Sequence, residues 1–297
     1  MRKMLSISAC SILLLFSGDP AFAGSGFLQP EVMVRDDPST VINRPANVQG
    51  LTGLIFTNSA YTQQKGRIVM GLASIAENSR KPDYSIAQGI ATVTAGITDR
   101  IEVGLRAQMI ATNLGSSATR ETGAGDLDLL VKWRISSQDD DLPAMALGLA
   151  FTLPTGDEDQ GFKGVQDQAV RIMVIGTSEK EMPGDYFIGL YFEGQIVQSD
   201  RLPGAEAKPT SDKYGVLNAG LLFPLNDSRS LQALFEYSGV FKKDIPSVYE
   251  QDHSSVMPGF RYVTDSFNLS LGVQLYNPDD PEINNGLRYM GTLSYAF

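Results

Sequence analysis

The side chains suited to covalent chemistry are few, because the 297-residue chain contains one histidine and one cysteine. His253 is followed by Ser254 and Ser255, and a serine activated by a histidine is a common hydrolase nucleophile. Adjacent side chains of an extended chain point in opposite directions, however, so this order does not by itself make a catalytic pair. A lipid-hydrolysing enzyme that uses His253 stays open as an alternative, but we expect no enzymatic activity.

Metal-binding residues are sparse too. Zinc sites and thiol redox sites need several His or Cys residues, which this composition excludes. Asp157–Asp159 and Asp279–Glu282 carry grouped carboxylates of the kind that binds calcium. Solvated acidic loops, or metal bridges to neighbouring lipopolysaccharide, explain these clusters equally well. We therefore expect no resident metal and no cofactor.

The overall composition narrows the class of protein. The formal net charge is −10, whereas binding to nucleic acid requires a basic surface, so nucleic acid is not an expected partner. Hydrophobic residues make up 42% of the chain and charged residues 20%, which excludes a fully disordered protein. The 29 Gly, 11 Tyr and 14 Phe residues favour strands and tight turns.

The first 23 residues have the pattern of a cleaved export signal. Arg2 and Lys3 precede a short apolar stretch, Ile12–Phe16. Pro20–Ala23 then supplies the small residues that a signal peptidase reads, so Gly24 is the expected start of the mature chain. The apolar stretch is too short for a membrane-spanning helix, and no later apolar run approaches the ~18 residues that such a helix needs.

Most of the remaining chain alternates between apolar and polar residues with a period of two. In Phe267–Leu275 the odd-numbered positions are Phe, Leu or Val, and the even-numbered positions are Asn, Ser, Gly or Gln. This spacing is typical of strands with one apolar face and does not fit a helix. Similar faces occur in Arg100–Met109, Asp126–Ile135, Ala144–Leu153, Tyr186–Ile196, Leu217–Leu225, Leu231–Phe241 and Val256–Thr264, and weaker ones in Gly66–Ala76, Tyr84–Ile97 and Ala169–Thr177.

Short and long connections alternate between these windows. The short links are 98–100, 137–141, 179–185, 226–230 and 264–266, and the long polar links are 112–123, 156–166, 199–212, 242–253 and 277–285. Short turns at one end and long loops at the other are typical of outer-membrane barrels. Counting from Gly66 gives twelve strands. We therefore predict an all-β, antiparallel, up-and-down transmembrane β-barrel.

Two other all-β folds were weighed against this prediction. A secreted β-propeller places four short strands in each repeat of ~40 residues, whereas this sequence has two long ones. A periplasmic β-sandwich would alternate in the same way as a barrel, but it does not explain the asymmetric loops. The C-terminus also favours the barrel, since Tyr289, Leu293, Tyr295 and the final residue Phe297 share one face. Such a strand resembles the signal recognised by barrel-assembly machinery, which we expect to be a partner.

Charged residues interrupt the polar faces of the predicted strands. A charge facing lipid at mid-depth would cost ~2–4 kcal/mol, so these residues are expected to face the lumen. They could line a narrow, hydrated pore, or they could pair across the lumen and close it. The residues are Arg100, Glu102, Arg106, Asp126, Asp128, Lys132, Arg134, Arg171, Glu193, Glu236, Arg261 and Arg288.

Three local patterns resemble a known family. Ala95–Leu105 (AGITDRIEVGL) is similar to a hairpin of that family, Gly123–Leu127 (GAGDL) followed by Lys132 to one of its strands, and Leu153–Gly156 (LPTG) to a strand end. The family is named for phenol meta-cleavage gene clusters, and its members are described as outer-membrane transporters. The resemblance runs from about Gly50 to the C-terminus and is dense between residues 90 and 160. It implies a barrel and the uptake of small molecules, hydrophobic ones among them.

Residues 24–65 precede the first predicted barrel strand. Three prolines make Gly24–Gln49 irregular, whereas Gly53–Ala60 is apolar. Three alternatives stay open for this segment. It could be an extra strand or a turn leading into the barrel, a plug that inserts Leu54, Ile55 and Phe56 into the lumen, or disordered chain.

We thus expect a signal peptide (1–23), a periplasmic N-terminal segment (24–65) and a transmembrane barrel (66–297). The barrel would lie in the cell outer membrane, in contact with lipid and lipopolysaccharide. Its expected function is the passive passage of a small-molecule solute, with selection by the lumen width, the charged residues and the outer loops. The alternative from a different class is a closed structural barrel whose outer loops bind a partner.

Overall fold

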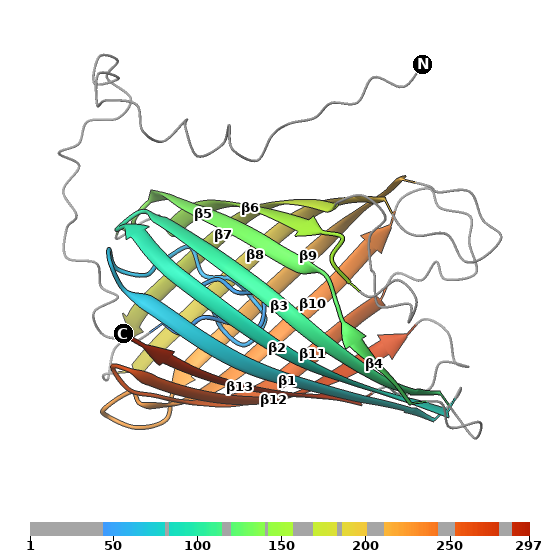
Figure 1. Ribbon diagram of the computed structural model, residues 1–297. Helices are drawn as coiled ribbons and strands as arrows, with labels where there is room; N and C mark the ends of the chain where they lie inside the picture. The colour runs from blue at the N-terminus through green and yellow to red at the C-terminus, as the bar shows by residue number, and fades with distance from the viewer. Residues whose placement is uncertain are drawn as a thin grey trace, which may run out of the picture. The chain divides into compact units, whose positions relative to one another are not determined.

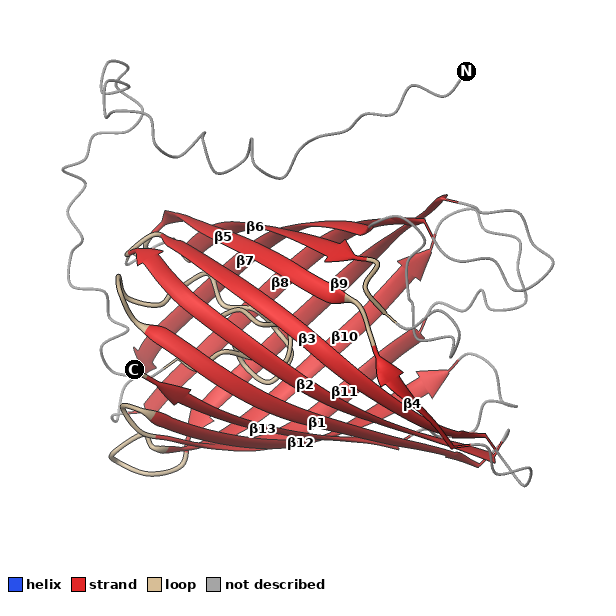
Figure 2. Cartoon of the chain, viewed as in Figure 1, coloured by secondary structure: helices blue, strands red, loops and turns tan. Residues whose placement is uncertain are grey.

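The computed structural model describes residues 44–80, 83–114, 120–139, 142–156, 169–182, 186–200, 211–242, 253–278 and 287–297, all of them strand, turn or loop (Figure 2). Within these ranges no helix is long and apolar enough to cross a membrane. The strands are β1 (Ile68–Arg80), β2 (Asp83–Thr98), β3 (Ile101–Leu114), β4 (Arg120–Ala124), β5 (Leu127–Ser136), β6 (Ala144–Leu153), β7 (Ala169–Met182), β8 (Tyr186–Asp200), β9 (Ser211–Pro224), β10 (Leu231–Lys242), β11 (His253–Val263), β12 (Phe267–Pro278) and β13 (Leu287–Ala296).

The strands close into one antiparallel barrel. From β5 to β13 each strand pairs with the next one in sequence, and β1 pairs with both β2 and β13. β4 and β5 both pair with β3 and are separated only by Gly125 and Asp126, so together they fill one position in the wall. The pairing of β2 with β3 completes a ring of twelve positions (Figure 1). The predicted twelve-stranded barrel is confirmed.

Alternating side chains divide the wall into an apolar exterior and a polar interior. On β5, Leu129 and Trp133 are 41% and 43% exposed on the outside, whereas Asp128 and Lys132 face inward and are buried. Exposed Leu, Ile, Phe and Tyr side chains continue around the exterior on every complete wall strand. Such a belt is unfavourable in water and is the surface expected against lipid. The alternation that was predicted from sequence is confirmed, and it places the barrel in a membrane.

The final strand completes this exterior. Tyr289, Leu293 and Tyr295 are 48%, 43% and 49% exposed, on the outer face of β13. The Phe297 N–H donates to the Ile68 carbonyl at 2.9 Å, so the last residue joins the first strand. Recognition of this strand by assembly machinery stays a prediction.

Several strand ends differ from the sequence prediction. β7 continues to Met182, into the predicted link at 179–185, and His253 is the first residue of β11 rather than part of a loop. The weakly alternating windows are also regular strands, β1, β2 and β7. Backbone pairing on both sides explains these differences, because a central strand is held by two ladders whatever its side chains.

Residues 44–65, called here the lumen segment, precede β1 and lie inside the barrel (Figure 1). The segment forms two isolated bridges, Ala46↔Thr52 and Gly53↔Asn58, and no strand. A turn at Gly50, where φ is 88°, reverses its direction, and this φ favours glycine. Its polar groups are hydrogen-bonded chiefly to one another and to the wall, which explains how irregular chain can be buried.

Apolar residues of the lumen segment fill gaps between its polar contacts. Leu54 and Ile55 are buried in a cluster with wall residues such as Leu222 and Met257, and Phe56 packs against its edge. A second cluster contains Leu51 and Tyr61 of the segment with Leu130, Met173 and Ile175 of the wall. A twelve-stranded barrel is wider than the eight-stranded barrels that wall side chains alone can fill, and here the segment occupies the extra space.

Candidate functional site

The candidate functional site is the lumen, where charged side chains of the wall bind the backbone of the lumen segment. Wall carboxylates accept hydrogen bonds from its N–H groups, and wall cations donate to its C=O groups. Buried charges need such partners, because an uncompensated charge in a low-dielectric interior is costly. The wall thus provides hydrogen bonds that a helix or sheet would otherwise give to this segment.

Glu236 of β10 binds three consecutive N–H groups. Its Oε1 accepts from Ile55 at 3.0 Å, and its Oε2 accepts from Phe56 at 3.0 Å and from Thr57 at 2.5 Å. Successive N–H groups that converge on one point form a cradle for an anion. In this protein the anion is a wall side chain, so Glu236 fixes both the position and the turn of the segment.

Glu102 of β3 and Lys132 of β5 bind a second part of the segment. Their charged groups form an ion pair at 3.0 Å, and both side chains are fully buried. The Glu102 carboxylate also accepts from the N–H groups of Thr52 at 2.8 Å and Gln63 at 2.7 Å. Lys132 Nζ donates to the carbonyls of Thr52 at 3.2 Å and Ser59 at 3.0 Å. One ion pair therefore joins three residues of the segment, all after the turn at Gly50, to the wall.

Glu193 of β8 binds Asn58, the residue after the Glu236 cradle. Its carboxylate accepts from Asn58 Nδ2 at 2.6 Å and from the Asn58 N–H at 3.2 Å. Two wall amides, Gln195 Nε2 at 3.0 Å and Asn218 Nδ2 at 2.9 Å, complete its hydrogen bonds. In the described part of the chain, no cationic group lies within 4 Å of the carboxylate of either Glu193 or Glu236.

Two arginines hold carbonyl groups of the segment. Arg261 of β11 donates from Nη2 to the Gly53 carbonyl at 3.0 Å and from Nε to Ser270 Oγ at 3.2 Å. Arg106 of β3 donates from Nε to the Val48 carbonyl at 3.0 Å. These contacts lie before and after the turn at Gly50, so release of the whole segment requires both to break.

Asp128 of β5 links two arginines near the lumen segment. Its Oδ2 lies 2.8 Å from Arg106 Nη1 and 3.1 Å from Arg171 Nη2, and its Oδ1 accepts from Thr152 Oγ1 at 2.5 Å. One carboxylate thus compensates two guanidinium groups on β3 and β7. The cluster carries a local excess of positive charge.

The lumen segment also brings a cation of its own. Arg44 Nη2 lies 2.5 Å from Glu179 Oε2 of β7, and the Tyr191 hydroxyl donates to Glu179 Oε1 at 2.6 Å. The Arg44 guanidinium stacks 3.6 Å from the centre of the Tyr61 ring, which belongs to the same segment. This cation would leave the wall together with the segment.

Glycines on the inner wall allow the close approach of the segment backbone. A Cβ at Gly104 would overlap the Gly50 carbonyl oxygen, and a Cβ at Gly96 would overlap the carbonyls of Gln63 and Gln64. The overlapping atoms are backbone atoms, which cannot rotate away as a side chain could. These two positions therefore tolerate only glycine while the segment is in place.

The predicted lumen-facing residues fall into three groups. Arg100 lies in the β2–β3 turn, where the chain reverses, and not in a strand as predicted. It is half-buried, and its lumen placement stays a prediction. Arg106, Arg171 and Arg288 are half-buried on inward faces. Glu102, Asp126, Asp128, Lys132, Arg134, Glu193, Glu236 and Arg261 are buried. Whether they line a conducting pore stays a prediction.

Several important contacts were not anticipated from sequence. Glu179 was assigned to a turn, although it shares the inward parity of Arg171 and could have been found by extending that strand. Asn218 was overlooked because an amide in a polar face gives no charge signal. Arg44 lies in irregular chain, where no periodicity indicates which wall residue it meets.

Other candidate sites give no support for chemistry. Asp157–Asp159 and Asp279–Glu282 lie outside the described residues, and within those residues no three metal-ligating side chains come together. The backbone of His253 pairs with Val240 and Pro278 at the start of β11. The Ser255 hydroxyl accepts from Gln274 Nε2 at 2.7 Å, as part of the wall.

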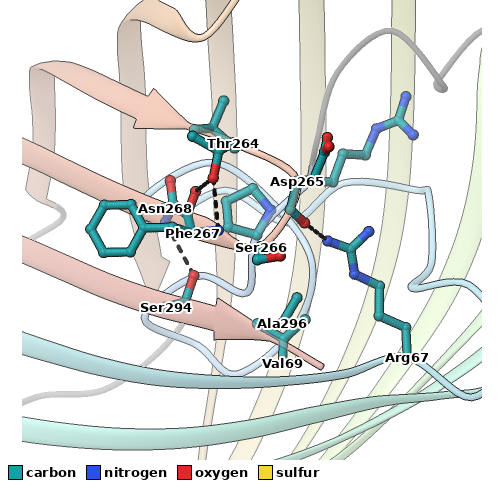
Figure 3. Close-up of a pocket in the computed structure, with 12 residues that line it drawn as sticks. Arg67, Val69, Thr264, Asp265, Ser266, Phe267, Asn268, Ser294 and Ala296 are labelled. Carbon is teal, nitrogen blue, oxygen red and sulfur yellow. Dashed lines mark hydrogen bonds between the residues drawn. The ribbon is translucent and has the colours of Figure 1, made fainter.

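A small pocket lies at the short-turn end of the barrel, between the β11–β12 turn and the ends of β1 and β13 (Figure 3). Arg67 donates to the Asp265 carbonyl, and Asn268 Nδ2 donates to Ser294 Oγ at 3.3 Å. The Phe267 N–H donates to Thr264 Oγ1 at 3.0 Å within the turn. These contacts join the turn to neighbouring strands, and we assign the pocket no ligand.

Two solved structures with a similar architecture are an outer membrane channel and a porin. An outer membrane channel from Pseudomonas putida F1 aligns with 80% of this chain and 98% of its own, with a TM-score of 0.59 and 11% sequence identity. The fold is that of an outer-membrane β-barrel. The NanC porin aligns with 76% of this chain and 98% of its own, with a TM-score of 0.52 and 9% identity.

Sequence comparison is less informative than structure. No protein-family model matches the chain, and no curated protein sequence matches it. The resemblance to the family named for phenol meta-cleavage clusters therefore stays a prediction. The predicted outer-membrane barrel is confirmed at the level of the fold. That its short-turn end faces the periplasm stays a prediction.

Proposed function

We propose that the protein is a gated outer-membrane channel for small solutes, closed at rest by the lumen segment and opened when that segment moves. The observation that carries this proposal is the relation between segment and wall. Every wall strand has its full set of neighbours without the segment, so the segment can leave the lumen without breaking a strand pair. Transport would then be passive, down the solute gradient, and would need no cofactor.

The nature of the contacts also supports movement. The segment has no regular structure, and its polar contacts with the wall are mainly hydrogen bonds between charged side chains and backbone groups. Water can replace such bonds at modest net cost, whereas a β-ladder between segment and wall would have to separate cooperatively. The wall exposed by this movement carries Glu, Lys, Arg, Asn and Gln, which favours polar solutes over the hydrophobic ones implied by the family resemblance.

Single-channel recording in planar bilayers tests this proposal. The unaltered protein should show rare openings, and Gly104→Ala should open often, because the added Cβ displaces the Gly50 carbonyl. Gly89→Ala on the neighbouring strand is the matched control, since a Cβ at Gly89 meets nothing within 4 Å. Silence from folded Gly104→Ala protein would contradict the proposal.

A permanently closed structural barrel is the second candidate. The buried Glu102–Lys132 pair favours it, because an ion pair with no exposure suits a fixed core as well as a gate. In that case Gly104→Ala would lower the stability of the barrel without producing current.

A further inference from the structure

Three carboxylates form an acidic arc on one side of the lumen. Glu179, Glu193 and Glu236 face inward from β7, β8 and β10, which are separated in the wall only by β9. Their exposures are 3%, 0% and 3%. In the described ranges, the one cation within 4 Å of any of them is Arg44, and Arg44 belongs to the lumen segment rather than to the wall.

The arc is now occupied by nitrogen donors of the segment. Arg44 places a guanidinium on Glu179, Asn58 places an amide and its N–H on Glu193, and three backbone N–H groups meet Glu236. The wall alone leaves these charges poorly compensated. Buried carboxylates that lose a cation and several N–H donors together must recruit replacements or take up protons.

Asn218 gives a second indication that the wall is shaped for a ligand. It lies on β9 and pairs across strands with Glu193 of β8. Two residues further along β9, Gly220 pairs with Glu236 of β10. Its side chain is fully buried, and its Nδ2 donates to Glu193 while its Oδ1 has no hydrogen-bond partner in the described structure. An acceptor without a donor beside two carboxylates is suited to an additional N–H group.

Two wall cations attract the arc from beyond ion-pair distance, Lys132 acting on Glu193 and Arg261 on Glu236, and they compensate its three charges only in part. Lys132 is paired with Glu102, and Arg261 binds Ser270 and the Gly53 carbonyl with no carboxylate within 4 Å among the described residues. Even if Arg261 turned toward Glu236 after release of the segment, the arc would keep excess negative charge.

We propose that the acidic arc is a binding site for solutes that carry primary amine or guanidine groups, and that the lumen segment occupies it at rest as an internal competitor. This inference rests on the proposed gating function, because the arc becomes accessible only when the segment moves. A diamine can span neighbouring carboxylates and supply the N–H donors that the segment now supplies. Binding of the solute and release of the segment are then coupled.

The first test measures release of the segment. Ser59→Cys places a thiol on a fully buried residue of the segment, and its reaction rate with a thiol reagent reports how often the segment leaves. We expect 1,5-diaminopentane to raise this rate by about fivefold or more, in the range of ordinary coupling between ligands. 1,5-Pentanediol has the same length without charge and should have no effect. Equal effects of the diamine and the diol, or no effect of either, would overturn the proposal.

Wall variants locate the effect. Glu193→Gln combined with Glu236→Gln should abolish the acceleration by the diamine relative to its own baseline. Glu181→Gln makes the same chemical change at a side chain that is 67% exposed, outside the arc, and should keep the acceleration. Persistence of the effect in the double variant would place amine binding elsewhere and refute the assignment.

Current through the Gly104→Ala channel separates this inference from the proposed function. If that channel conducts and the diamine neither blocks current nor accelerates thiol modification, the amine site is wrong while gating stands. If no variant conducts but the diamine still accelerates modification through Glu193 and Glu236, the site stands and passage through the barrel is wrong.

Discussion

Glu102 and Lys132 face each other across β3 and β5, form an ion pair at 3.0 Å, and both bind Thr52 of the lumen segment. Neither side chain is exposed. Two neighbouring wall residues of opposite charge thus hold the N–H and the C=O of one residue in the segment. The same principle applies around the lumen, where acidic side chains bind N–H groups and basic ones bind carbonyls.

Removing one member of this pair should loosen the segment more than removing both. Glu102→Gln leaves Lys132 buried without its counter-charge, which costs about 3–5 kcal/mol in comparable buried pairs. Movement of the segment admits water to Lys132 and relieves this cost, so openings in planar bilayers should become frequent. The double variant Glu102→Gln with Lys132→Met should lie closer to the unaltered protein than either single variant. Strictly additive effects would contradict the coupling.

Loss of Arg44 should weaken the attachment of the N-terminal end of the lumen segment to the wall. Arg44→Ala removes a charged hydrogen bond to Glu179, of the kind worth about 1.5–3 kcal/mol, together with the contact with Tyr61. We expect at least a severalfold higher open probability. Arg67→Ala is the control, since Arg67 binds the Asp265 carbonyl at the short-turn end of the barrel. If both variants open to the same extent, Arg44 has no specific part in closure.

Asp128 should control the ion selectivity of the open channel. Asp128→Asn removes the carboxylate that compensates Arg106 and Arg171, which then share one part of the wall as uncompensated cations. In the Gly104→Ala background, the reversal potential in a salt gradient should shift toward anion selectivity. Gly194→Ala is a suitable wall control, because a Cβ there meets nothing within 4 Å. An unchanged reversal potential would show that this cluster does not face the conduction path, and a shift toward cation selectivity would contradict the predicted sign.

A charge introduced on the lipid-facing surface should lower the stability of the barrel. Leu271 is 57% exposed on the outer face of β12, so Leu271→Arg would place a charge against lipid. The expected loss is about 2–4 kcal/mol in the free energy of unfolding from vesicles if the residue lies near mid-depth. An unchanged free energy of unfolding would mean that this face of β12 is not in contact with lipid.

The barrel could be predicted because its environment imposes a pattern on each strand separately. Lipid outside and polar groups inside force an alternation of period two, and it is legible even in a single strand such as Phe267–Leu275. Strand ends were less predictable, as at His253, because backbone pairing extends a strand beyond its side-chain pattern.

The lumen contacts could not be predicted in the same way. Glu236 and Phe56 are 180 residues apart in the sequence. The Glu236 carboxylate binds backbone N–H groups, and because every non-proline residue has one, no side-chain pattern identifies its partner. Sequence therefore indicated that Glu236 faces inward without indicating its partner. The one available signal was the glycine at inward positions such as Gly104, whose meaning becomes clear only when the close approach of Gly50 is known.

The most direct test of the account is to lock the lumen segment to the wall reversibly. Ser59 Oγ and Thr177 Oγ1 are 3.4 Å apart, so Ser59→Cys with Thr177→Cys requires a small shift to form a disulfide. The one native cysteine, Cys10, lies in the predicted signal peptide. In the Gly104→Ala background, the oxidised protein should be silent, and frequent openings should return after reduction. Equal current from the oxidised and reduced proteins would show that the lumen segment is not the gate.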